Sequence, residues 1–244
     1  MYEGSDAQGI DSVFVIGNGP SRKNIDISKL DGTVIGCNAC YRDFTPDVIC
    51  ATDAGIIGDI IESGYDGQCY FTHNSWNLLP EEAYDSLANG TEHTTYRRFD
   101  SEYFVYISGL DDEVKKTQSY IIWVPKKMEH KIKNLNSFYG WSTGTSAVYV
   151  ACRDFTCNDY EKVYLLGFDQ VSDNYDNLYA DTKHYYSKDS KLRWLDAHKK
   201  WTEELLTVIE EHPALQFIWV NYRGDDFPKL PNLFSKDEEK LWQA

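Results

Sequence analysis

The 244-residue chain lacks any excess of basic residues, and its 24 lysines and arginines are outnumbered by 39 aspartates and glutamates. The net charge of −15 argues against nucleic acid or an anionic membrane as a partner, because both bind through a basic face. No apolar run approaches the ~18 residues of a transmembrane helix. Residues 1–11 also lack the basic start and apolar stretch of a signal peptide. We therefore expect a soluble, cytoplasmic protein.

The sequence has neither internal repeats nor low-complexity segments, and with 42% apolar residues it can bury a sizeable core. We expect one domain spanning residues 1–244. The six cysteines have irregular spacings. Cys37 and Cys40 are spaced like metal ligands, but no second Cys/His pair of comparable spacing follows them. The sequence therefore predicts free thiols in the core and no metal site.

Short apolar runs alternate with amphipathic stretches, which predicts an α/β fold with a mainly parallel sheet. The expected strands are Ser12–Ile16, Thr33–Cys37, Val48–Ala51, Cys69–Thr72, Lys162–Leu166 and Gln216–Tyr222. The expected helices are Ala54–Ser63, Thr145–Phe155 and Asp189–Glu211. Between residues 89 and 139 the alternation gives way to aromatic strand-like segments, Tyr103–Ile107 and Tyr120–Val124. We therefore expect a single Rossmann-like domain with a small aromatic insertion or lid.

The turn Gly17-Asn18-Gly19-Pro20-Ser21, directly after the first expected strand, carries the strongest functional signal. Glycines at a strand end let backbone N–H groups approach a ligand, and Asn18 and Ser21 add side-chain hydrogen bonds beside a helix N-terminus. Arg22 stands where the dinucleotide fingerprint G-x-G-x-x-G has its third glycine, and the phosphate loop G-x-x-x-x-G-K-[ST] is absent. The pattern favours a mononucleotide site, and a tight strand-to-helix turn without a ligand is the alternative.

Polar residues follow the other expected strands too. They are Asn38, Thr52-Asp53, His73-Asn74-Ser75 and Asp169. Ligands of open parallel sheets bind beyond the carboxyl ends of the strands, so these residues are expected in one crevice. A further cluster, Ser142-Thr143-Gly144-Thr145-Ser146, precedes the helical residues Ala147–Phe155 and predicts either an anion or ribose contact or an ordinary N-cap.

The segment from Gln170 to Lys188 contains tyrosines, aspartates and His184 but almost no aliphatic residue. Phenol hydroxyls can donate hydrogen bonds to a departing phosphate, and an imidazole can accept a proton from an attacking hydroxyl near neutral pH. His184 is therefore the predicted general base. His198, inside the last expected helix, is its rival.

These motifs occur in the order found in the bacterial lipooligosaccharide sialyltransferases, which use CMP-sialic acid. The matching segments are Val15–Ser21, Cys37-Asn38, Ser142–Ser146, Val163–Asp169 and Tyr179–Lys183. The chain resembles that family over roughly residues 12–222, although the middle does not match. The resemblance implies a Rossmann-like domain with a lid, transferring a sugar from a cytidine nucleotide to a glycan hydroxyl without a metal or other cofactor.

The same resemblance implies roles for individual residues. Asn18, Gly19 and Ser21 would contact the cytidine nucleotide. The positions of Gly17, Asp53 and Asp169 at the strand ends, independently of the resemblance, predict that they too contact the nucleotide. Asn38 would lie near the phosphate or the sugar, and Thr143, Gly144 and Thr145 would hold the ribose and base. Tyr179 would stabilise the leaving phosphate and His184 would be the base. The family's other phosphate-binding tyrosine falls where this chain has Val171, so Tyr175 would have to substitute for it.

A second family shares the Gly-x-Gly-Pro-Ser start, the archaeal-type 6-hydroxymethylpterin diphosphokinases. They transfer pyrophosphate from ATP with Mg²⁺, for which Asp53 and Asp169 would be hard oxygen ligands. Both aspartates could instead accept hydrogen bonds from loop N–H groups. A protein that binds a nucleotide or glycan without chemistry is the third reading, and a homo-oligomer stays open in all three.

Overall fold

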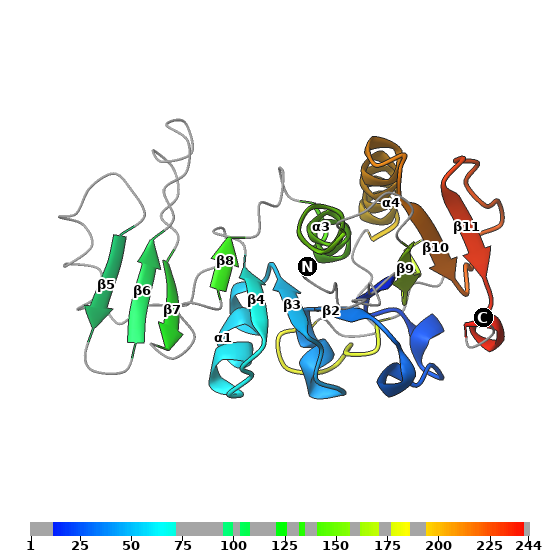
Figure 1. Ribbon diagram of the computed structural model, residues 1–244. Helices are drawn as coiled ribbons and strands as arrows, with labels where there is room; N and C mark the ends of the chain where they lie inside the picture. The colour runs from blue at the N-terminus through cyan, green and yellow to red at the C-terminus, as the bar shows by residue number, and fades with distance from the viewer. Residues whose placement is uncertain are drawn as a thin grey trace, which may run out of the picture.

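The computed structural model describes residues 12–71, 95–99, 103–107, 121–125, 132–134, 141–156, 162–170, 177–185 and 194–241. Within these ranges the main sheet has eight strands in the order β11-β10-β9-β1-β2-β3-β4-β8, and every pairing is parallel. The strands are β1 (Ser12–Ile16), β2 (Thr33–Cys37), β3 (Val48–Ala51), β4 (Gln68–Phe71), β8 (Ile132–Asn134), β9 (Lys162–Leu166), β10 (Gln216–Val220) and β11 (Leu233–Lys236). The predicted parallel α/β domain is confirmed (Figure 1).

The strand order reverses direction at β1. The chain first builds outward from β1 through β2, β3 and β4 to β8, then returns to place β9 on the other side of β1 and continues through β10 to β11. Such a reversal leaves a crevice beyond the carboxyl ends of the two central strands, because the connections that follow them diverge to opposite sides. The turn after β1 and the turn after β9 border this crevice.

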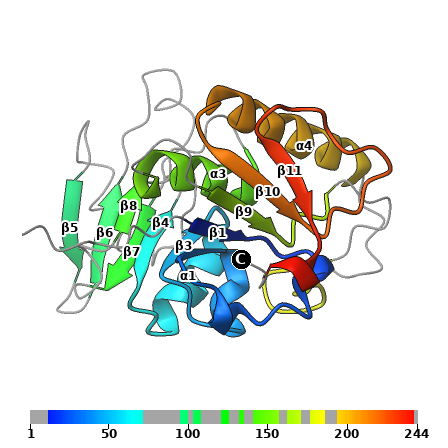
Figure 2. The ribbon, with the colours of Figure 1, turned by 45° about the vertical axis from the view of Figure 1, so that its right-hand side comes forward.

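Both faces of the central strands are buried, which explains their continuous apolar runs. Val13 and Val15 of β1 pack with α3 (Thr143–Val150) and α4 (Trp194–Glu211), whereas Phe14 and Ile16 pack into a separate cluster on the opposite face. Helix α1 (Ala54–Glu62) buries Ile56, Ile57 and Ile60 against β3 and β4. Figure 2 shows α3 and α4 on one side of the sheet and α1 on the other.

Short helices fill the connections near the crevice. Three 3₁₀ turns follow β1 and β2, namely η1 (Pro20–Arg22), η2 (Ile27–Lys29) and η3 (Asn38–Arg42). Helix α3 continues into a π-helical segment, η6 (Ala151–Phe155), and a further 3₁₀ turn, η7 (Glu238–Lys240), follows β11. No helix among the described residues has the length and apolar character needed to cross a membrane.

The expected aromatic insertion divides between two sheets. Strands β5 (Thr95–Phe99), β6 (Tyr103–Ile107) and β7 (Ile121–Pro125) form a separate antiparallel sheet, which stands beyond the β4–β8 edge in Figure 1. Strand β8, within the same stretch of sequence, instead pairs with β4 and extends the main sheet. The predicted boundary at residue 139 therefore assigned one strand of the main sheet to the insertion.

Candidate functional site

A cavity of about 350 Å³ opens beyond the carboxyl ends of the central strands, where the strand order reverses. This volume lies near the lower end of the ~300–1,000 Å³ typical of small-molecule sites. The cavity is lined by Gly17, Asn18, Cys37, Asn38, Thr52, Asp53, Trp141, Ser142, Thr143, Gly144, Gly167, Phe168, Gln170, Asn177, His184, Tyr185 and Trp201. Six of the residues predicted to contact a nucleotide are in this set, together with the predicted base.

The two glycines of the turn pack against the end of β9, where their N–H groups are paired instead of facing the cavity. The N–H of Gly17 donates to the Leu166 carbonyl at 2.7 Å, and that of Gly19 donates to the Gly167 carbonyl at 2.9 Å. The N–H of Ser21 donates to the Asp169 carboxylate at 2.8 Å. Gly19, Ser21 and Asp169 therefore support the turn from behind, and none of the three lines the cavity.

Arg22, in place of the third glycine, fastens the same turn from below. Its side chain is 5% exposed, and its Nε donates to the Gly17 carbonyl at 2.8 Å. Its Nη2 donates to Asp43 at 3.2 Å and to the Tyr179 hydroxyl at 2.7 Å. In the dinucleotide fingerprint, a glycine at this position permits close packing of the helix on the strand. Here Arg22 takes its place, and its hydrogen bonds tie Gly17, Asp43 and Tyr179 together; we call these contacts the Arg22 brace.

Tyr179 belongs to that brace and not to the cavity lining. Its side chain is 4% exposed, and its hydroxyl donates to Asp43 at 2.6 Å while accepting from Arg22. Burial raises the pKa of the Tyr179 phenol, so the group stays neutral. The predicted contact between Tyr179 and a leaving phosphate does not fit this position.

Among the described tyrosines, Tyr185 is the one that lines the cavity. Its hydroxyl accepts from Asn18 Nδ2 at 3.0 Å and from the Ala39 N–H at 3.4 Å. Asn18 Oδ1 accepts in turn from the Cys40 thiol at 3.2 Å, which fixes the direction of the amide. Asn18 and Tyr185 therefore form one polar pair at the floor of the crevice. Tyr185 was not singled out in the sequence, because neighbouring tyrosines gave no sign of which would face inward.

A second polar group surrounds Asn38, which adopts a left-handed φ of 51° at the start of η3. Its Nδ2 donates to Thr143 Oγ1 at 3.1 Å and to Asp53 Oδ2 at 3.4 Å, and its Oδ1 accepts from the Thr52 N–H at 3.4 Å. The hydroxyls of Thr52 and Thr143 also contact each other. Three strand and helix ends that are distant in sequence are thereby joined into one surface.

Asp53 gives this surface its charge. It keeps an exposed edge toward the cavity, but the surrounding protein raises the pKa of its carboxylate through desolvation. No lysine or arginine is among the described residues that line the cavity. A carboxylate in this setting favours ligand groups that donate hydrogen bonds, such as paired hydroxyls, over a phosphate.

The start of α3 faces the cavity with two backbone donors. Ser142 caps the helix, because its Oγ accepts from the Thr145 N–H at 3.1 Å, so the expected N-cap is confirmed. The Ser142 N–H approaches Glu204 of α4 at 3.4 Å. Among the described residues, no acceptor is paired with the N–H groups of Thr143 and Gly144, which a helix leaves without intrahelical partners. Thr145 is 1% exposed and lies behind them.

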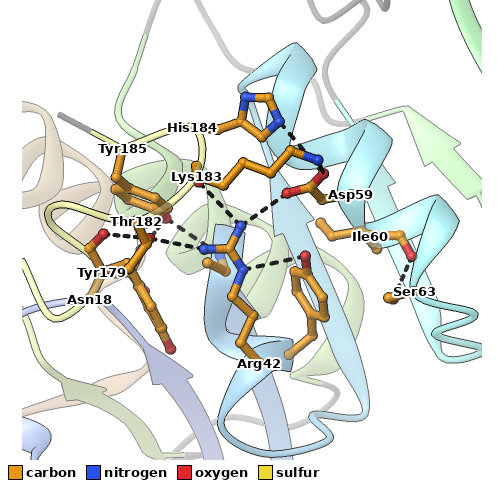
Figure 3. A network of polar contacts seen from close by, with 12 residues as sticks. Asn18, Arg42, Asp59, Ile60, Ser63, Tyr179, Thr182, Lys183, His184 and Tyr185 are labelled. Atoms are coloured by element: carbon orange, nitrogen blue, oxygen red, sulfur yellow. Dashed lines mark hydrogen bonds and ion pairs between the residues drawn. The ribbon is translucent and has the colours of Figure 1, made fainter.

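His184 reaches the cavity from the segment Asn177–Tyr185 and rests on the first turn of α1. A Cβ on Gly55 would lie 2.7 Å from His184 Cγ, so the imidazole occupies the space that a side chain at position 55 would fill. His184 Nε2 lies 3.5 Å from Asp59 Oδ1 (Figure 3). Asp181 and His184 both have left-handed φ angles, 64° and 65°, which cost a non-glycine residue about 1–2 kcal/mol each.

Aromatic side chains complete the walls. Trp141, which precedes α3, Trp201 of α4 and Phe168 after β9 all line the cavity. Phe168 meets Trp219 edge to face at a centroid distance of 6.5 Å, which fixes its ring. The helical spacing of Trp201 suits a core position as well as a cavity wall, and no signal in the sequence separates the two roles. Flat apolar walls beside amide and hydroxyl groups suit a nucleobase or a sugar ring.

Some predicted residues cannot be placed in this geometry. Tyr175 and the segment His73–Ser75 lie outside the described residues, and for His198 the backbone of α4 is described but the side chain is not. The two aspartates of the magnesium hypothesis are not brought together, because Asp169 is 2% exposed and bonded to Ser21, whereas Asp53 faces the cavity. The alternative predicted for Asp169, a hydrogen bond to a loop N–H, is confirmed.

The described cysteines occupy separate places in the core. Cys37, Cys40, Cys50, Cys69 and Cys152 are all buried, and none of these described cysteines forms a disulfide. The Cys37 thiol approaches the Thr143 carbonyl and the Cys40 thiol approaches the Ile16 carbonyl. Despite a spacing typical of metal ligands, the two thiols therefore pack against different parts of the core. Burial raises the pKa of Cys152 to about 12 and that of Cys37 well above its usual range, which leaves both as unreactive thiols.

Comparisons with protein-family models, with curated proteins and with solved structures each returned no match. The assignment of a function therefore depends on the chemistry of the cavity.

Proposed function

We propose that this protein is a nucleotide-sugar-dependent glycosyltransferase, similar to the sialyltransferases, which transfers a sugar from a cytidine nucleotide to a glycan hydroxyl. The observation that carries the proposal is the cavity at the strand-order reversal, where amides, hydroxyls and a helix N-terminus meet aromatic walls and a histidine. The sequence resemblance at Val15–Ser21, Ser142–Ser146 and Val163–Asp169 gives the donor class.

The polarity of the cavity suggests how the nucleotide lies. Asp53, Asn38 and the hydroxyl of Thr143 form the end that accepts hydrogen bonds from the ribose hydroxyls. Asn18 and Tyr185 form the end where the phosphate lies, since amide and phenol groups can donate to its oxygens. Trp141 and Trp201 provide surfaces on which the cytosine can stack.

His184 supplies the proton acceptor. An acceptor hydroxyl gives its proton to the imidazole while its oxygen forms a bond to the anomeric carbon of the sugar. The bond from that carbon to the phosphate oxygen breaks, and the electron pair leaves with the nucleotide monophosphate. Donors at Asn18, Tyr185 and the start of α3 stabilise the charge that develops on the phosphate. Acid–base catalysis of this kind typically contributes ~10²–10⁴-fold.

The test is a thermal-shift screen of CMP, CDP, UDP and ATP, each with and without Mg²⁺. A ligand at 100 times its Kd stabilises the folded state by about 2.7 kcal/mol. For a chain of this size that raises Tm by about 5–11 °C. We expect CMP to give this shift equally with and without Mg²⁺. Stabilisation by ATP with Mg²⁺ alone would contradict the proposal and favour a diphosphokinase.

A turnover assay separates an enzyme from a binding protein. Glycan acceptors are incubated with CMP-sialic acid, and released CMP is measured for the wild type and for His184→Ala. We expect His184→Ala to bind CMP normally and to lose at least about 100-fold in rate. A loss below threefold would remove His184 from the mechanism, and CMP binding without turnover in any acceptor would favour the non-catalytic reading.

A further inference from the structure

Arg42 of η3 reaches across to the end of the segment Asn177–Tyr185. Its Nη1 donates to Thr182 Oγ1 at 3.0 Å, and its Nη2 donates to the Lys183 carbonyl at 3.2 Å. The same Nη2 donates to Asp59 Oδ2 of α1 at 3.0 Å. Figure 3 shows the guanidinium at the centre of these contacts, between the segment and the helix.

Asp59 holds the same segment through its second oxygen. Asp59 Oδ1 accepts from Lys183 Nζ at 2.6 Å and lies 3.5 Å from His184 Nε2. The Asp59 side chain is 12% exposed, so its ion pairs with Arg42 and Lys183 are partly shielded from water. Although burial opposes the effect, Lys183, His184 and Arg42 lower the pKa of Asp59, so the carboxylate is charged at neutral pH.

The turn that Arg42 and Asp59 contact contains two residues with unfavourable backbone angles. Asp181 and His184 are left-handed on either side of Thr182 and Lys183, and such residues persist where the surrounding structure fixes them. The internal bonds of the segment are short-range, for example Thr182 N–H to the Tyr179 carbonyl and Tyr185 N–H to the Thr182 carbonyl. Contacts from Arg42 and Asp59 join this turn to η3 and α1, in addition to the hydrogen bond from the Ala39 N–H to Tyr185 and the packing of His184 on Gly55.

We propose that Arg42 and Asp59 are positioning residues, which hold the turn Asp181–Tyr185 so that His184 and Tyr185 line the cavity. Neither Arg42 nor Asp59 lines the cavity itself. Their effect on a bound nucleotide and on the reaction passes through the two residues they place. The expected effect on nucleotide binding and on the reaction rests on the proposed function, whereas the placement of the turn by Arg42 and Asp59 does not.

The experiment measures amide hydrogen exchange of residues 177–185 in the ligand-free protein, and CMP affinity by calorimetry, for Arg42→Ala, Arg42→Lys and Asp59→Asn. Lysine keeps the charge that pairs with Asp59 but cannot span the three acceptors that the guanidinium fork reaches. We therefore expect all three variants to exchange this segment about tenfold faster, with CMP affinity reduced about tenfold or more.

Asp237→Asn is the matched control, because Asp237 forms an exposed ion pair with Lys240 at 3.0 Å beside η7, and neither residue lines the cavity. It should change neither readout, and unfolding curves check that the variants remain folded. Unchanged exchange at residues 177–185 in Arg42→Ala and Arg42→Lys overturns the positioning role. If exchange rises as expected but the wild type binds no CMP, the placement stands and the proposed function fails.

Discussion

Gly19→Ala tests whether the glycine turn is fastened to β9 as the structure has it. A Cβ at position 19 would lie 2.6 Å from Asp169 Cγ and 2.7 Å from the Gly167 carbonyl oxygen. Neither group can move aside cheaply, since one is backbone and the other is 2% exposed and bonded to Ser21. Losing that charged hydrogen bond costs about 1.5–3 kcal/mol. Overpacking adds about 1–3 kcal/mol. The sum, about 2.5–6 kcal/mol, is a large part of a typical free energy of unfolding of ~5–15 kcal/mol.

Urea unfolding with linear extrapolation measures this loss. Gly64→Ala is the control, because Gly64 has a φ of 76° and nothing within 4 Å of its Cβ position, so it pays only the left-handed strain of about 1–2 kcal/mol. We expect the free energy of unfolding to fall clearly more in Gly19→Ala than in Gly64→Ala. Equal losses in the two variants would refute the packing of the turn against Gly167 and Asp169.

Four further substitutions separate ligand contacts from structural roles. Tyr185→Phe should weaken CMP binding about tenfold or more in calorimetry, whereas Tyr179→Phe should leave CMP affinity within threefold and lower the unfolding free energy by about 1–3 kcal/mol. Asp53→Asn should raise Tm at pH 7 but not at pH 3, because a carboxyl group whose pKa is raised by folding destabilises the folded state only at a pH where it is ionised. In calorimetry, the same variant should show a smaller preference for CMP over dCMP. Gly55→Ala should displace the exposed His184 ring, and so reduce turnover while Tm is kept.

Strand positions could be predicted where both faces are buried. Strands β1, β2, β3 and β9 have the bounds expected from their unbroken apolar runs. Strand β11 was missed, because as an edge strand it buries Leu233 but exposes Phe234 and Ser235, which leaves no apolar run. Helix α3 starts at Thr143, two residues before the expected start, because Ser142 caps it. The sequence offers several neighbouring hydroxyls that could form such a cap, so the position of the cap could not be predicted.

The site could be predicted in outline but not in detail. The crevice at the strand ends followed from the alternation of elements, and Asn18, Asn38, Asp53 and Thr143 do meet there. The choice between Tyr179 and Tyr185 depends on the left-handed turn at Asp181 and on the buried Arg22 brace, which involve residues far apart in sequence. Such pairings have no local sequence signal.

A calorimetric titration of CMP into the wild type and into Asn18→Ala, without divalent metal, tests the central claim most directly. Asn18 lines the cavity and joins Tyr185 to Cys40, so its loss removes a donor to the phosphate and releases the cavity phenol. We expect saturable binding of one CMP by the wild type and about tenfold or greater weakening in Asn18→Ala. No heat of binding in the wild type, or equal affinity in both proteins, would contradict it.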